Sequence, residues 1–269
     1  MQGIDALVRT IQEIASGQYS NDIMALTRED QPKTVRTIAE AMGLMMVKVE
    51  AREYRLELMV KELEALNEKI KQNTIQVVSA MAHALAARDA YTEGHAARVA
   101  DVACNIARQM ALPQEEIEFI RLGGILHDIG KIGFPDTLFE PHANKNPSDL
   151  VKQITRHPST GAKILQDLDF LGPALEYVHC HHERPDGKGY PRHLKAEEIP
   201  LGAKILAVAD AFDAMTTDRP YQKGKRPEVA LDILKKGSGE KWDDSCVSAF
   251  DAVLNGAQPD WKTAEPQTD

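Results

Sequence analysis

Apolar residues in the first third of the chain recur at the three- and four-residue spacing of amphipathic helices. Residues 4–15 form one such segment, and a polar connector then runs to Pro32. The next helical pattern alternates between steps of three and four residues from Met42 to Val77. This heptad seam predicts a parallel two-stranded coiled coil that makes the protein a homodimer. The seam consists of Met42, Met45, Val49, Arg52, Leu56, Met59, Leu63, Leu66, Ile70, Asn73 and Val77.

The N-terminal helices also allow other interpretations. One is that the long helix folds back on its own domain and buries the seam there. Roughly residues 1–50 resemble a HAMP-type signalling module, with a short helix, a glycine-containing connector and a second helix. Such modules usually follow a membrane helix, and the chain has no run of about 18 apolar residues to form one. A simple helical hairpin for dimerisation remains an alternative.

The helical pattern continues beyond residue 74, where several prolines are placed to open helices at their first turn. No segment alternates apolar and polar residues with a period of two. We therefore predict an all-α fold, a helical bundle preceded by a helical hairpin and a long coiled-coil helix. A short β-hairpin is expected near Pro185–Pro191.

Histidines divide the chain unevenly. All nine lie at or after His83, so the composition shifts near residues 74–83. We predict a helical dimerisation and signalling segment over residues 1–73, a catalytic domain over 74–257 and a flexible C-terminal tail over 258–269. Because the helical pattern runs unbroken into residues 74–88, we expect the coiled coil to pass a signal to the catalytic domain by rotation or a register change.

Composition and charge exclude some classes of function. The chain has 269 residues, 43% of them apolar and 27% charged, as in soluble globular proteins. Its net charge of −9 argues against general DNA binding, which needs a basic surface. Without a long apolar run or a secretory signal, we expect no membrane insertion and a cytoplasmic location. The three unclustered cysteines are typical of reduced cytosolic thiols.

Polar side chains interrupt the apolar pattern at a few places in the second part of the chain. His127 and Asp128 end an apolar run, and Lys131 follows one helical turn after His127. Asp210 similarly interrupts an apolar helix, where an unpaired carboxylate would be costly. Each position alone has a structural explanation, but together they fit a bundle that projects imidazoles and carboxylates to one point. The histidines in this set are His95, His127, His157, His181 and His182.

All these donors are nitrogen or oxygen, without cysteine, which suits iron, manganese or zinc. Two long motifs then carry a family resemblance: His127-Asp128-Ile-Gly-Lys131, and the segment from His181-His182-Glu183 through Gly189-Tyr190-Pro191. Together with the segment around Asp210, they resemble the HD-GYP branch of the HD metal-dependent phosphohydrolases. The resemblance covers roughly residues 75–257.

This resemblance implies a phosphodiesterase that hydrolyses cyclic di-GMP to linear pGpG or GMP with a metal-activated hydroxide. It implies a binuclear centre, most often of iron, with manganese as the other candidate. One metal would be held by His95, His127, Asp128 and Asp210. Asp128 would bridge to a second metal held by His157, His181 and His182. A third metal in some members uses a glutamate where this chain has Tyr91, so we expect two metals.

The resemblance also suggests roles for residues around the metals. Asp128 and Lys131 are the candidate catalytic residues, and Lys131 would hold the scissile phosphate. The other candidate substrate contacts are Arg219, Tyr190 and Lys223. The basic residues that would hold the substrate phosphate form the predicted phosphate clamp. Members often have a basic residue of this clamp where this chain has Gln222, and Lys223, next in sequence, would take its place. The loop Gly189-Tyr190-Pro191 either forms a tight turn or contacts a ligand or a partner, such as a GGDEF-type signalling protein.

Two other functions remain open from the sequence. A receptor would bind the nucleotide without turnover and relay its presence through the coiled coil. A different HD hydrolase would act on another cyclic dinucleotide or phosphate ester. The complete set of binuclear ligands favours an active enzyme over a receptor.

Overall fold

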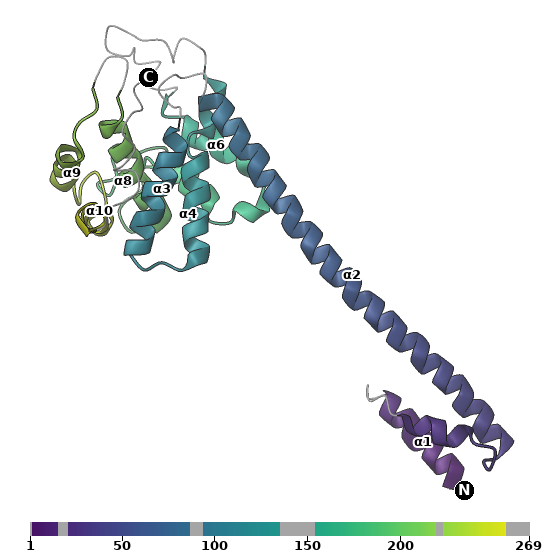
Figure 1. Ribbon diagram of the computed structural model, residues 1–269. Helices are drawn as coiled ribbons and strands as arrows, with labels where there is room; N and C mark the ends of the chain where they lie inside the picture. The colour runs from purple at the N-terminus through teal and green to yellow at the C-terminus, as the bar shows by residue number, and fades with distance from the viewer. Residues whose placement is uncertain (1, 16–20, 87–93, 135–153, 219–222, 257–269) are drawn as a thin grey trace, which may run out of the picture. The chain divides into compact units, whose positions relative to one another are not determined.

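The structure, a computed structural model, describes residues 2–15, 21–86, 94–134, 154–218 and 223–256 (Figure 1). These residues form helices, and their only β interactions are isolated bridges, Asp186 with Lys195 and Ser238 with Trp242. The predicted all-α class is therefore confirmed, and one antiparallel bridge replaces the hairpin expected near Pro185–Pro191. The predicted tail, residues 258–269, lies outside the described residues. No described helix is long and apolar enough to cross a membrane.

The helices follow one another without intervening strands. In the first part they are α1 (Gln2–Ala15), the 3-10 helix η1 (Asn21–Thr27) and α2 (Lys33–Ala86). In the second part they are α3 (His95–Gln109), α4 (Gln114–Leu126), η2 (Ile129–Gly133), α6 (His157–Leu165), η4 (Asp169–Leu171), α7 (Ala174–Cys180), α8 (Leu201–Thr216), α9 (Pro227–Lys236) and α10 (Asp244–Gly256).

Contacts divide the chain into two compact units, Met1–Gln72 and Asn73–Asp269. In the first unit, α1 and η1 pack on the beginning of α2. Their shared core consists of Leu7, Ile23, Leu26, Val35, Ala39, Met42 and Met46. Met42, the first residue of the heptad seam, is thus buried within its own unit.

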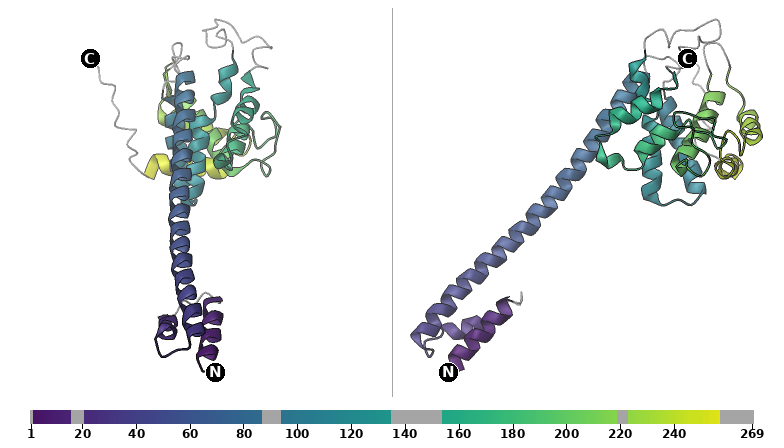
Figure 2. Two further views of the ribbon diagram at one scale, coloured as in Figure 1. Left: turned by 90° about the vertical axis from the view of Figure 1, so that its right-hand side faces the viewer. Right: turned by 180° about the vertical axis from the view of Figure 1, so that it is seen from behind.

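Beyond the half-buried Val49, the heptad seam on α2 faces solvent in the single chain. Leu56, Leu63 and Ile70, for example, are 51%, 68% and 55% exposed. An uninterrupted helix carries them, as the long ribbon of α2 shows (Figure 2). Exposed leucine and isoleucine side chains at heptad spacing are the pattern that a coiled-coil partner buries.

The second unit is organised around α3 and α8. α3 packs against both α4 and α8, and its buried face includes Val99, Ala103 and Ile106. Gly124 lets α4 approach α3 closely, because a side-chain carbon at this position would lie 2.7 Å from the Cα of Ala100. This contact brings the end of α4 next to the beginning of α3, where the polar residues of the site lie.

A second core cluster supports the same end of α4 from the other side. It joins the last turns of α2 to α4, α6 and α7, through Ala82, Leu126, Ile129, Leu165, Leu171, Ala174 and Val178. Leu126 and Ile129 flank the pair His127 and Asp128 in sequence. Burial of these two neighbours fixes the backbone that carries the polar pair.

Candidate metal centre

The pair His127–Asp128 lies at the junction between α4 and η2. His127 caps the C-terminus of α4, and its Nδ1 lies 2.8 Å from the carbonyl oxygen of Gly124. Gly130 in η2 packs directly on the backbone at the start of α6, where a side chain would collide with the carbonyl oxygen of His157. The glycine after the His-Asp pair therefore lets α6 bring His157 up to Asp128.

The first group of donors gathers around the Nε2 atom of His95. This atom lies 3.3 Å from Nε2 of His127, 3.4 Å from Oδ1 of Asp210 and 3.7 Å from Oδ2 of Asp128. His95 comes from the start of α3, His127 from the end of α4 and Asp210 from the middle of α8. Helices far apart in sequence thus direct two imidazoles and two carboxylates to one point.

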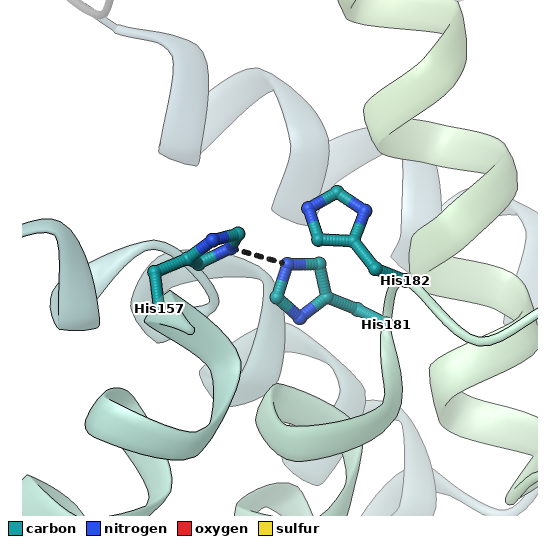
Figure 3. Close-up of side chains that lie close together, drawn as sticks. All are labelled: His157, His181 and His182. Atoms are coloured by element: carbon teal, nitrogen blue, oxygen red, sulfur yellow. Dashed lines mark hydrogen bonds between the residues drawn. The ribbon is translucent and has the colours of Figure 1, made fainter. Parts of the chain in front are cut away.

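The second group contains three histidines from α6 and from the end of α7. Nε2 of His157 lies 3.2 Å from Nε2 of His181, and His182 follows directly in sequence (Figure 3). One ligand nitrogen from each of the three lies within 4.8 Å of the others. His157 and His181 are both 1% exposed, so these rings are shielded from bulk solvent.

Asp128 lies between the two groups and presents one oxygen to each. Its Oδ2 is 3.3 Å from Nε2 of His127, whereas its Oδ1 is 3.4 Å from Nε2 of His157. A carboxylate in this position can bridge two cations. The structure thus brings together all seven residues that the sequence suggested as metal ligands.

The donor chemistry fits metal ions. Nδ1 of His157 lies 2.7 Å from the carbonyl oxygen of Ile154, and Nδ1 of His181 lies 2.7 Å from that of Val178. When Nδ1–H donates to a carbonyl, the other ring nitrogen carries a lone pair. The two Nε2 lone pairs then face each other across 3.2 Å, an arrangement that a shared cation stabilises. Two ligands about 2.1 Å from one ion lie roughly 3.0–3.4 Å apart, which matches these separations.

The electrostatics of the first group favour positive charge. Burial alone would lower the pKa of His95, but hydrogen bonds to Asp210 and Asp213 raise it to about 9. Burial alone would raise the pKa of Asp128, but Lys131 and His127 hold it well below its ordinary value. The pKa of Asp210 is likewise lowered against the effect of burial, chiefly by His95. Both carboxylates are therefore ionised at neutral pH.

In the second group, the environment favours the neutral form of the histidines. Burial lowers the pKa of His182 to about 4, and burial together with neighbouring histidines lowers that of His181 well below its ordinary value. The pKa of His157 is also lowered, mainly by burial. These three rings are neutral at pH 7, which is the form that binds a metal ion.

Three residues outside the suggested ligand set shape the site. Asp213 accepts a hydrogen bond from Nδ1 of His95, at 2.7 Å, and pairs with Arg98. Glu183 is 2% exposed and accepts hydrogen bonds from the backbone N–H groups of Arg192 and Leu194. Sequence reasoning assigned none of them a role, although a buried carboxylate one turn after Asp210 was a visible signal.

The loop after His182 lies against the second group. Gly189 packs on the backbone of Glu183 and Arg184, where a side chain would collide, so the loop is a tight turn here. The ring of Tyr190 lies 4.8 Å from the ring of His182, centre to centre, with an angle of 35° between the planes. Burial, with Asp210 and Asp128 nearby, raises the pKa of the Tyr190 hydroxyl. Tyr190 is thus a neutral wall of the site.

The other suggested substrate contacts have different outcomes. Nζ of Lys131 lies 2.6 Å from Oδ2 of Asp128, so this ammonium is at the centre. Lys223 is exposed in the segment before α9. Arg219 and Tyr91 lie outside the described residues, so the phosphate clamp and the number of metals stay predictions.

The family profile described as HD domain matches residues 79–246. The chain belongs to the HD domain family. The matched range contains both histidine groups and the Gly189-Tyr190-Pro191 loop, and together with relatives named as cyclic di-GMP phosphodiesterases it confirms the HD-GYP resemblance.

Relatives agree with this assignment. The chain is 34% identical over 237 residues to a cyclic di-GMP phosphodiesterase response regulator, RpfG, of Xanthomonas campestris, covering 86% of this chain and 61% of that one. It is 31% identical over 192 residues to a 3′3′-cGAMP-specific phosphodiesterase of Vibrio cholerae, covering 71% and 41%. The chain therefore spans less than two thirds of the length of these relatives.

A solved structure shares the fold. It is described as an HDG"Y"P protein from Bdellovibrio bacteriovorus, and it superposes with a TM-score of 0.51 at 22% identity. The match covers 69% of this chain and 61% of the other. This likeness supports the helical HD domain as the architecture of the second unit.

Proposed function

We propose that the chain is a metal-dependent phosphodiesterase that hydrolyses cyclic di-GMP to linear pGpG or GMP. The observation that carries this proposal is the position of Asp128, with one oxygen toward His127 and the other toward His157. Relatives named as cyclic di-GMP phosphodiesterases support the substrate. A binuclear centre is the arrangement that many phosphodiester-cleaving enzymes use.

The residues divide naturally between two metal positions. The first position consists of His95, His127, Asp128 and Asp210, and the second of Asp128, His157, His181 and His182. Two ions there would lower the pKa of a shared water and withdraw charge from the phosphoryl oxygens. The positive charge of two divalent ions would exceed the negative charge of Asp128 and Asp210, so the loaded site would attract a phosphodiester anion. The oxygen and nitrogen ligands suit iron or manganese, and we expect iron rather than manganese.

Lys131 and Tyr190 would act on the substrate directly. The side chain of Lys131 is 27% exposed beside Asp128, so its ammonium can turn toward a phosphoryl oxygen without leaving the site. There it would hold the scissile phosphate and offset negative charge as it develops. Tyr190 stacks near His182 and offers its ring and hydroxyl at the edge of the second position.

The N-terminal unit would make the enzyme a homodimer and carry its input signal. The exposed seam on α2 supports a coiled coil, because apolar residues such as Leu63 and Leu66 are exposed to water in the single chain and a second helix would bury them. A rotation or register change of this coiled coil would act on residues 74–86, whose apolar face joins the core beside His127. A fragment that starts near residue 72 and keeps the same activity and dimeric state would contradict this role.

The Gly189-Tyr190-Pro191 loop could also bind a signalling protein, such as one of the GGDEF type. The close packing of Gly189 and the hydrogen bonds from the backbone of Arg192 and Leu194 to Glu183 hold this loop in a fixed shape. A fixed loop suits recognition, because little conformational entropy is lost on binding. Exchange of the exposed Lys188 for Glu would weaken such a complex without changing hydrolysis in the isolated protein.

The test uses the full chain purified without oxygen and loaded with Fe²⁺ or Mn²⁺. We expect two metals per chain and turnover of cyclic di-GMP, both lost in Asp128→Asn. Tight nucleotide binding without turnover in both metal forms would instead identify a receptor. Faster hydrolysis of 3′3′-cGAMP than of cyclic di-GMP would identify the other substrate class, which the Vibrio cholerae relative is named for.

A further inference from the structure

Three of the histidines are oriented by backbone carbonyl groups. In each, Nδ1 lies 2.7–2.8 Å from the carbonyl oxygen of the residue three positions earlier. For His127 and His181, which follow α4 and α7, this carbonyl belongs to the last turn of the helix and lacks an intrahelical partner, so it is available to accept the hydrogen bond. The pairs are His127 with Gly124, His157 with Ile154 and His181 with Val178.

His95 is held differently. It is the first residue of α3, as His157 is of α6, but its Nδ1 faces a carboxylate. Its Nδ1 instead lies 2.7 Å from Oδ2 of Asp213 on α8. Asp213 follows Asp210 by three residues, so one face of α8 directs two carboxylates at the same ring. Asp210 faces Nε2, at 3.4 Å, and Asp213 faces Nδ1.

Arg98 keeps Asp213 charged in this buried place. The Asp213 side chain is 5% exposed, and an ionised carboxylate there needs a compensating partner. Nε of Arg98 donates to Oδ1 at 2.6 Å, and Nη2 donates to Oδ2 at 3.1 Å. This two-point contact fixes the plane of the carboxylate, and Arg98 is one turn after His95 on α3. Arg98, Asp213 and His95 thus form a chain of hydrogen bonds that ends at Nδ1 of the imidazole whose Nε2 faces the first metal position.

We propose that Asp213, held by Arg98, is a positioning residue that makes the first metal position tighter than the second. A carboxylate that accepts a hydrogen bond from Nδ1–H fixes the ring tautomer. It also makes Nε2 a more basic metal ligand than a carbonyl in the same place would. The first position also has Asp210 in addition to the shared Asp128, whereas the second adds only neutral histidines. This inference rests on the binuclear centre proposed above and adds an order to the filling of its two positions.

Metal titration of the full chain tests the proposal without measuring activity. The protein is stripped with a chelator and titrated with Mn²⁺ in a calorimeter at about pH 9, so that protons do not compete with the ion for the histidines. We expect two steps, and His182→Ala, which removes a ligand of the second position, should abolish the weaker one. Asp213→Asn keeps the shape and an acceptor oxygen but removes the charge. It should weaken the tighter step about 10–100-fold and change the weaker step by less than about threefold.

Asp243→Asn is the matched control. Asp243 is also a largely buried carboxylate with a cationic partner, since its Oδ2 lies 3.2 Å from Nζ of Lys204, but among the described residues it pairs with no histidine. Both steps should be unchanged in this variant. If Asp213→Asn fails to fold, Arg98→Lys takes its place, because it keeps the positive charge and loses the two-point contact. It should weaken the tighter step in the same direction by a smaller factor.

The outcomes separate this inference from the proposed function. Unchanged affinities in Asp213→Asn, or equal weakening of both steps, would overturn the role of Asp213 while leaving a binuclear centre in place. Loss of the tighter step in His182→Ala would reverse the order of the two positions and also overturn it. A wild-type chain that takes up neither Mn²⁺ nor Fe²⁺ would instead refute the proposed function.

Discussion

The ammonium of Lys131 lies 2.6 Å from Oδ2 of Asp128, the same oxygen that faces His95 and His127. The lysine and the first metal position therefore compete for one carboxylate oxygen. A metal ion on this oxygen would repel the ammonium and free it to turn toward an anionic substrate. The contact links metal loading to the availability of the lysine.

Replacement of Lys131 by glutamine should separate these two effects. Turnover should fall about 10²-fold, because a positive charge near the developing phosphoryl charge is lost. Mn²⁺ affinity should stay the same or rise, because the competitor for Asp128 is gone. Steady-state hydrolysis and calorimetric titration of the same preparation measure both. Lys188→Gln, which changes a 78% exposed lysine, is the control and should alter neither. A parallel loss of metal and turnover in Lys131→Gln would contradict this account.

Gly130 and Gly133 offer a matched pair within η2. A side chain at residue 130 would collide with the carbonyl oxygen of His157, whereas one at residue 133 would meet no atom within 4 Å. We expect Gly130→Ala to lower the free energy of unfolding by about 1–3 kcal/mol, as overpacking does, and to weaken the second metal position by moving His157. Thermal unfolding and Mn²⁺ titration measure the two effects.

Gly133→Ala should leave both properties near those of the wild type. Equal effects of the two substitutions would mean that helix propensity in η2, and not the contact with α6, determines the result. A loss of stability without any change in metal affinity would show that His157 can move independently of the backbone at Gly130.

The sequence was sufficient to predict the helical class and to select seven residues that the structure brings together, for a physical reason. His127, Asp128 and Asp210 stand out because they interrupt apolar helices, where unpaired polar groups are costly. The long motifs then related them to distant histidines. The heptad seam is equally visible, since its spacing is a property of the sequence alone.

The resemblance suggested Asp210 as a ligand, but the apolar pattern alone does not distinguish its role from that of Asp213. Both are carboxylates one turn apart on the same apolar helix. Which of them faces Nε2 of His95 depends on how α8 is rotated against α3, a property of packing. The need for glycine at residues 130 and 189 is similar, because it arises from backbone contacts between segments that the sequence does not show to be close.

Metal binding should depend on pH differently at the two positions. Asp210 and Asp213 raise the pKa of His95 to about 9, so the metal-free protein carries a proton there at pH 7. A metal ion must displace it, so affinity at the first position should rise about tenfold per pH unit from pH 7 and level off above about pH 9. Burial lowers the pKa of His182 to about 4, and those of His157 and His181 are also lowered. The second position should therefore change little above pH 6.

Calorimetry at pH 6.5, 7.5 and 8.5, in buffers of different ionisation enthalpy, measures this difference. About one proton should be released with the first-position ion and close to none with the second. Asp243→Asn is again a suitable control and should show the same pH profile as the wild type. Equal proton release in both steps would contradict the assignment of the raised pKa to His95.

The coiled coil makes a prediction that separates the seam from other exposed apolar residues of α2. Leu63 lies in the seam and is 68% exposed, whereas Leu58 lies outside the seam and is 44% exposed. Leu63→Asp would place two carboxylates in the dimer interface, so the dissociation constant should rise by about 100-fold or more. Leu58→Asp adds the same charge on the outer surface and should leave the dimer intact. Sedimentation equilibrium of the full chain at micromolar concentration measures both. A monomeric wild type, or equal dissociation in the two variants, would show that this seam does not hold two chains together.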